Sequence, residues 1–88
     1  MDRTRAVEVL RDAGLHADVR NDGSIRGYVQ RDTSGVVPLY LGSFAITPLE
    51  SESWFFESFA AGVPATDREI EFATLEEAVR AAIRINAP

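Results

Sequence analysis

The sequence contains no cysteine and no lysine, and it has a single histidine, His16. Without cysteine the chain can form neither a disulfide nor a thiolate metal site, and it has no cysteine nucleophile. One histidine cannot supply the several imidazole ligands of a multi-histidine zinc site. We therefore expect no metal centre built on these ligands and no thiol chemistry.

Positive charge is also scarce. All nine basic residues are arginines, and fourteen acidic residues bring the formal net charge to −5. Residues 1–31 carry six arginines and five acids, whereas residues 32–88 carry three arginines and nine acids. Binding to nucleic acid or to an anionic membrane depends on Lys and Arg side chains that neutralise phosphates. We therefore expect no nucleic-acid partner and no membrane partner.

Long hydrophobic runs are missing as well. No apolar stretch approaches the ~20 residues of a membrane-spanning helix, and the charged residues 1–5 lead into no apolar segment of the secretory type. The length of 88 residues fits one small domain, so we expect a cytoplasmic protein with a single domain over 1–88. The use of Arg in place of Lys, with abundant Ala, Val and Asp, is typical of a GC-rich bacterial genome.

Helical periodicity is found at the two ends of the chain. Near the start, Asp2 or Thr4 can cap a helix that ends before Gly14, a residue suited to the left-handed position after a helix. Near the end, Thr74 and Glu77 form a capping-box pattern, in which the Thr oxygen accepts from the Glu amide and the Glu carboxylate accepts from the Thr amide. The second helix has an apolar stripe at helical spacing, made of Leu75, Ala78, Val79, Ala82 and Ile83.

Between the helices the apolar residues alternate with polar ones, which predicts strands. A hairpin is expected over 17–30 with its turn at 21–24, followed by strands at 36–46, 53–60 and 68–73. Pro38 lacks an amide donor, which favours an edge position or a bulge for the 36–46 strand, and Gly42 is a place where that strand can bend. Residues 47–51 and 61–67 are expected to be loops.

The predicted element order is α-β-β-β-β-β-α. Consecutive strands joined by short turns favour an antiparallel meander of four or five strands. The fold class that follows is α+β, a two-layer sandwich in which the amino-terminal and carboxy-terminal helices pack on one face of the sheet. No motif identifies a family.

The sequence contains no clear catalytic or cofactor-binding motif. Ser43 lacks the second glycine of a G-x-S-x-G elbow, and His16 and Asp18 share a strand face but are expected to be simply exposed. Gly23, Gly27 and the other glycines between the helices fit neither a P-loop nor a dinucleotide fingerprint, and turns account for most of them. We expect no catalytic residue and no cofactor.

The carboxylates of the second half could form a cluster if the last two strands are neighbours. Such a cluster could bind a hard divalent cation or act in acid/base catalysis, but alternation explains it more simply as the solvated face of a sheet. The residues concerned are Glu50, Glu52, Glu57, Glu69 and Glu71.

When the strands are laid on one sheet, their side chains divide into two faces. The apolar members are assigned to the core: Ala17, Val19, Ile25, Val29, Val37, Leu39, Leu41, Trp54, Phe56, Ile70 and Phe72. The opposite face then holds His16, Asp18, Arg20, Arg26, Tyr28, Gln30, Tyr40, Phe55, Glu57, Phe59, Glu69 and Glu71. Four aromatic side chains mixed with Arg and Glu are typical of a recognition surface. The alternative is that Phe55 and Phe59 are covered by loops carrying Leu49 or Val63.

Three functions are compatible with this sequence. The first is a non-enzymatic interaction module, a homodimer or a partner of another protein, that uses the second face. Its candidate residues are Tyr28, Tyr40, Phe55, Phe59, Arg26, Glu57 and His16. The second is an acidic inhibitor or immunity-type protein that binds a basic partner. The third is a small enzyme or small-molecule binder with a pocket between that face and a loop.

Overall fold

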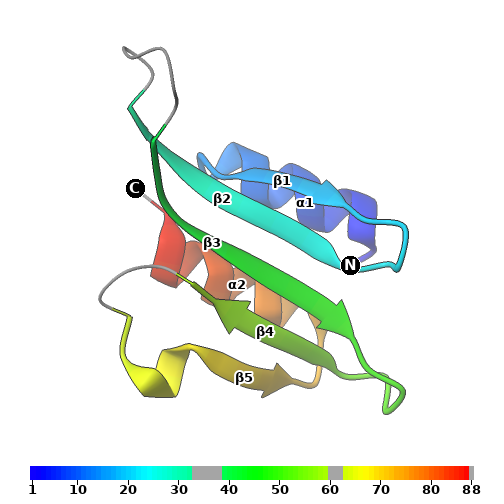
Figure 1. The fold of residues 1–88 in the computed structure, drawn as a ribbon. Helices are drawn as coiled ribbons and strands as arrows, with labels where there is room; N and C mark the ends of the chain where they lie inside the picture. Colours follow the sequence, from blue (N-terminus) through cyan, green and yellow to red (C-terminus); the bar gives the residue numbers. More distant parts are fainter. Residues whose placement is uncertain (33–38, 60–62, 88) are drawn as a thin grey trace.

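The computed structural model describes residues 1–32, 39–59 and 63–87, and for 29–32 and 39–41 it describes the backbone alone. The elements are α1 (Arg3–Asp12), β1 (His16–Val19), β2 (Ile25–Asp32), β3 (Leu39–Pro48), β4 (Trp54–Ser58), the 3-10 turn η1 (Ala65–Asp67), β5 (Glu69–Phe72) and α2 (Leu75–Asn86). The strands form one sheet in the order β1-β2-β3-β4-β5, and every neighbouring pair is antiparallel. Both helices lie on the same side of this sheet (Figure 1). The predicted two-layer α+β fold is therefore confirmed.

Local side-chain contacts fix the start and end of α1. The Asp2 carboxylate accepts a hydrogen bond from the Arg5 amide at 2.8 Å, so Asp2 and not Thr4 caps the helix. After the helix, Gly14 has a φ of 89°, and the Leu15 amide donates to the Leu10 carbonyl at 3.1 Å. This turn directs the chain from α1 into the edge strand β1.

The cap of α2 is the predicted residue, but the predicted reciprocal contact is wrong. The Thr74 hydroxyl oxygen accepts from the Glu77 amide at 3.2 Å. The Glu77 carboxylate accepts from the Thr74 hydroxyl at 3.1 Å, where the sequence predicted the Thr74 amide as the donor. One hydroxyl can both accept and donate, so the two side chains satisfy each other. Arg80 and Glu76 form the predicted i,i+4 ion pair at 2.9 Å.

The central strand β3 differs most from expectation. It continues to Pro48, so residues 47–48 belong to a strand and not to the predicted loop, and its central position makes the predicted edge alternative wrong. Its pairing with β2 is irregular: Val29 lies opposite Gly42, but Gln30 lies opposite Tyr40. The residue between, Leu41, is thus an extra residue in β3, as in a β-bulge. Residues 36–38 of the predicted strand lie outside the described residues.

The core lies between the helices and one face of the sheet. Its largest fully buried side chains include Leu10 from α1, Val79 from α2, and Phe44, Ile46 and Phe56 from the sheet. The ring centroids of Phe44 and Phe56 lie 6.4 Å apart. Phe44 and Ile46 were absent from the predicted core because the bulge shifts the alternation of β3 by one residue.

Several predicted core residues are less buried than expected. Trp54 and Phe72 are half-buried and pack against the core, and the side chains of Val29, Leu39 and Leu41 lie outside the described ones. Val19 is 45% exposed, and Ile70 is half-buried. Both lie on edge strands, β1 and β5, where one flank has no neighbouring strand to cover a side chain. Neither helix of the described residues is long and apolar enough to cross a membrane.

Candidate interface on the open face of the sheet

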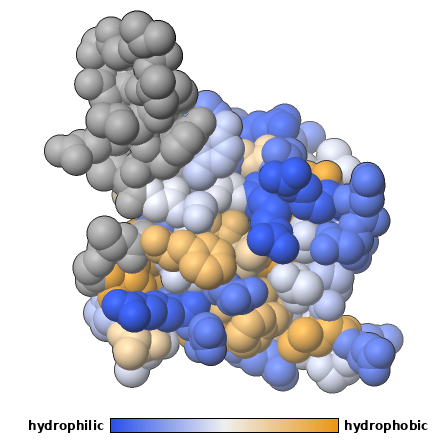
Figure 2. Space-filling model, in the orientation of Figure 1, coloured by the Kyte–Doolittle hydropathy of each residue, from blue (hydrophilic) through white to orange (hydrophobic). Residues whose placement is uncertain are grey.

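The candidate site is the sheet face turned away from the helices, which we call the open face. The pairing of the strands assigns to it His16, Asp18, Arg26, Tyr28, Ser43, Ala45, Thr47, Phe55, Glu57, Glu69 and Glu71, with Phe59 directly after β4. Figure 2 shows this side of the molecule, where apolar patches are bordered by strongly hydrophilic regions. Nine of the expected residues thus lie on this face, whereas Arg20 follows β1 outside the paired residues and the side chains of Gln30 and Tyr40 lie outside the described ones.

Aromatic side chains on the open face differ in their exposure. Phe59 is 59% exposed, whereas Phe55 and Tyr28 are half-buried. Leu49 is half-buried and Val63 is buried. The loops that carry them nevertheless leave Phe59 exposed to solvent. The loop alternative is therefore wrong for Phe59, which is an unusually large apolar group to leave exposed.

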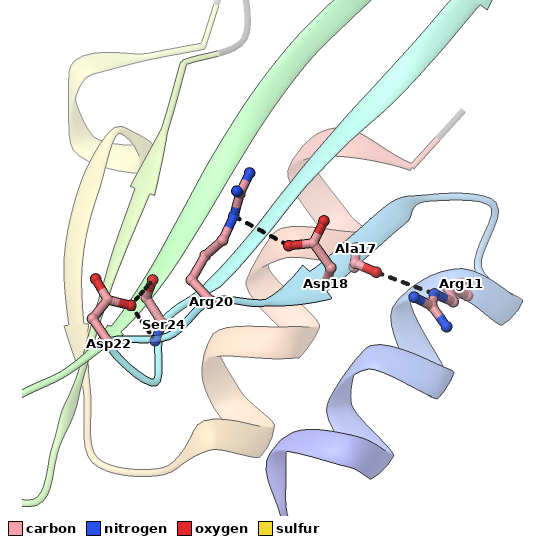
Figure 3. Close-up of polar contacts among 6 residues, drawn as sticks. All are labelled: Arg11, Ala17, Asp18, Arg20, Asp22 and Ser24. Carbon is pink, nitrogen blue, oxygen red and sulfur yellow. Dashed lines mark hydrogen bonds and ion pairs between the residues drawn. The ribbon is translucent and has the colours of Figure 1, made fainter.

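His16 and Asp18 share the open face, but each contacts a different neighbour. The His16 ring stacks on Tyr28, its cross-strand neighbour, with centroids 4.8 Å apart and an interplanar angle of 9°. The Asp18 carboxylate instead lies 3.1 Å from the Arg20 guanidinium, and both groups are largely exposed (Figure 3). A stack of this kind stiffens the two side chains as a flat surface.

Over residues 43–47 of its central strand, β3, the open face carries only small side chains. Every second residue of this stretch points to this face, and these residues are Ser43, Ala45 and Thr47. Ala45 is only 1% exposed because larger neighbours flank it. Beside this column a hollow of about 200 Å³ lies between Tyr28 and Phe59; it is also lined by Asp18, Arg20, Arg26, Gly27, Ser43 and Phe44. A hollow of this size is smaller than typical small-molecule pockets of ~300–1,000 Å³.

A larger hollow of about 500 Å³ lies at the edge of the sheet, where the end of α1 meets β1. There the Arg11 guanidinium donates to the Ala17 carbonyl at 3.1 Å (Figure 3). A charged side chain in this position discourages another strand from adding to the edge. This hollow was not predictable from the sequence, because it depends on how α1 lies against β1.

The glutamates of the open face lie on its β4–β5 side. Glu57 on β4 lies directly opposite Glu69 on β5, and Glu71 lies opposite Phe55. Glu50 and Glu52 lie in the turn between β3 and β4 and do not join them. Within residues 1–32, 39–59 and 63–87, no group of three or more His, Asp or Glu side chains is placed to hold a metal ion.

The carboxyl group of Asp22, in the β1–β2 turn, has a shifted pKa. The Ser24 hydroxyl donates to the Asp22 carboxylate at 2.6 Å, and the Ser24 amide donates to the same oxygen at 2.8 Å (Figure 3). These bonds favour the ionised form and lower the pKa of Asp22 below its ordinary value of 3.8. They stabilise a tight turn in which Gly23 has a φ of 84°.

Comparison of the chain with protein-family models, with curated proteins and with solved structures finds no significant match.

Proposed function

We propose that the protein is a cytoplasmic, non-enzymatic interaction module that binds protein through its open face, in the simplest case a second copy of itself. The observation that carries the proposal is Phe59, a 59% exposed aromatic side chain beside the hollow that also contacts Tyr28. Tyr, Phe and Arg together are the residue types enriched at protein interfaces.

The layer arrangement supports the same proposal. α1 contacts β1 and α2, and α2 contacts β3, β4 and β5, so both helices cover the core side of the sheet. A five-stranded sheet whose second face mixes aromatic and charged side chains is suited to packing on another surface. A homodimer is the commonest oligomer and needs no second gene product.

The test is the solution mass at about 100 µM, measured by light scattering for the wild type and for Phe59→Glu and Phe55→Glu/Phe59→Glu. We expect a dimer for the wild type and monomers for both variants, with unchanged circular dichroism. Val19→Glu is the matched control, because it places the same charge on a 45% exposed apolar residue of the other face. A monomeric wild type, a dimeric double variant or a monomeric control would overturn the proposal.

The acidic side of the open face supports a second candidate, an inhibitor that binds a basic protein. Glu57, Glu69 and Glu71 would supply its contacts. Attraction of this kind weakens as salt screens the charges, whereas docking of Phe59 does not. Association that falls steeply between low and physiological salt, and is insensitive to Phe59→Ser, would favour this candidate over the first.

A further inference from the structure

The open face has a row of mostly charged side chains whose two halves differ in net charge. Across the five strands, in register, lie Asp18, Arg26, Ala45, Glu57 and Glu69. Asp18 is already paired with Arg20 at 3.1 Å. With Asp18 paired, the β1–β2 half of the row presents the positive charge of Arg26. The β4–β5 half carries two negative charges, and buried Ala45 lies at the centre.

We infer that two copies dock face to face about a twofold axis running along β3, so that Arg26 of each copy meets Glu57 of the other. This inference rests on the proposed function and specifies its partner and geometry. A face-to-face pair of identical sheets has its twofold axis between the sheets, because the same patch must contact itself. An axis along β3 exchanges β2 with β4, which brings opposite charges together.

The alternative axis, perpendicular to the strands, places β2 on β2 and β4 on β4. It would bring the two Arg26 sides together and the two Glu57 sides together. Like charges facing each other across an interface are unfavourable, whereas complementary charges fix the docking register. Both axes allow the aligned packing that sheets prefer, so the charges decide between them.

The neighbouring row of side chains agrees with the axis along β3. It consists of Tyr28 on β2, Ser43 on β3 and Phe59 after β4, whose amide donates to the Ser43 carbonyl at 2.8 Å. The same exchange places Phe59 of the second copy over Tyr28 and the hollow of about 200 Å³ beside it. The exposed Phe59 thereby gains an apolar contact with the Tyr28 ring.

Repulsion between the like charges at the outer ends of the row is weak in this arrangement. Asp18 of one copy approaches Glu69 of the other, but Arg20 already neutralises Asp18. These side chains lie on the edge strands, where solvent screens their charges. The contacts nearest the axis, between Arg26 and Glu57, therefore set the orientation.

Charge reversal tests the pair. Arg26→Glu and Glu57→Arg each change two symmetric contacts, and we expect each to raise the dimer Kd by about tenfold or more. The double variant Arg26→Glu/Glu57→Arg restores both contacts with the charges exchanged, and its Kd should return to within about threefold of the wild type. Single variants that leave the dimer Kd unchanged, or a double variant whose Kd is as high as that of the single variants, would overturn the arrangement.

The control reverses a pair outside the interface. Glu76 and Arg80 on α2 form an ion pair at 2.9 Å and are both largely exposed. Glu76→Arg and Arg80→Glu carry the same changes in net charge as the test variants, and we expect the dimer Kd to remain unchanged. A control that weakens the dimer equally would mean that net charge, and not the Arg26–Glu57 pair, sets the affinity.

Crosslinking tests the axis independently, because the natural chain has no cysteine. Packed sheets lie about 10 Å apart, which a short bismaleimide can bridge. Thr47→Cys, on β3 and thus close to the axis, should link to itself. Asp18→Cys should link to Glu69→Cys in a mixture but not to itself.

The two proposals fail in different ways. A wild-type chain that stays monomeric at about 100 µM removes both the proposed function and this arrangement. A wild-type dimer in which Asp18→Cys links to itself, or in which the charge-exchanged double variant is not rescued, keeps the proposed function and overturns the arrangement alone.

Discussion

Gly27→Ala should destabilise the protein, although glycine in the middle of a strand is ordinarily a weak choice. Gly27 lies on β2 between Ala17 and Phe44, on the core side of the sheet. A Cβ atom built there would overlap the Phe44 Cζ atom and lie 2.5 Å from its Cε1 and 2.7 Å from the His16 carbonyl oxygen. The Phe44 ring is 1% exposed and packs against Phe56, so it has little room to withdraw.

Two opposing effects set the size of the loss. Overpacking a core costs about 1–3 kcal/mol, and the upper part of this range applies because both a ring and a backbone oxygen are met. Replacing glycine by alanine in a strand recovers about 0.5–1 kcal/mol of backbone entropy. We expect a net loss of about 1–2 kcal/mol in the free energy of unfolding, which lowers Tm by roughly 4–16 °C.

The assay is urea denaturation at one fixed protein concentration, followed by the fluorescence of Trp54, the single tryptophan. Phe44→Leu provides the second arm of a double-mutant cycle, because it removes the ring atoms that the new Cβ meets. The double variant should be more stable than the two single losses predict, by about 0.5 kcal/mol or more. A Gly27→Ala protein as stable as the wild type, or an additive cycle, would refute the reasoning.

Three further outcomes follow from the helices and the β1–β2 turn. Thr74→Ala should lower the free energy of unfolding by about 1 kcal/mol, because the Glu77 amide loses its acceptor, while Thr74→Ser should not. Val79→Ala, at a side chain that is 1% exposed, should cost about 1–3 kcal/mol through the cavity it leaves, and a neutral result would contradict the packing of α2 on the sheet. Ser24→Ala should raise the pKa of Asp22 towards 3.8, measured by NMR titration of the carboxyl group, because the hydroxyl donor is lost. In the wild type the lowered pKa stabilises the fold at pH values above 3.8, and this contribution is lost as the pH falls below 3.8 through the folded-state pKa; an unshifted carboxyl would contradict it.

The ends of the helices were predictable because their signals are local. Asp2 and Thr74 contact amides three residues away, and Gly14 needs only its own backbone freedom to turn the chain. The choice between Asp2 and Thr4, and the donor that the Glu77 carboxylate accepts from, depend on side-chain rotamers that composition does not determine.

The sequence did not predict which residues of the central strand, β3, face the core. Alternation assigned Leu39 and Leu41 to the core, and their side chains lie outside the described ones. The extra residue in β3 arises from pairing with β2 and changes which of the following residues face the helices. Phe44 and Ile46 are the side chains that this shift brings into the core. Gly27, grouped with turn glycines in the sequence, is explained by the Phe44 ring that occupies the space of a side chain.

Most of the candidate interface followed from the period of two, because a strand places alternate residues on one face. His16, Arg26, Phe55 and Glu57 were assigned to the open face in this way. The exposure of Phe59, the stack of His16 on Tyr28 and the Asp18–Arg20 ion pair were not predictable, because they depend on neighbouring strands and on rotamers.

The most direct test of the open face as an interface is hydroxyl-radical footprinting of the wild-type chain at increasing protein concentration. Phe59 and Met1 are similarly exposed apolar side chains, at 59% and 52%, and Met1 precedes α1 outside the proposed interface. Between about 1 µM and about 100 µM, oxidation of Phe59 should fall severalfold while that of Met1 stays constant. Equal oxidation of Phe59 at both concentrations, or equal protection of both residues, would contradict the account.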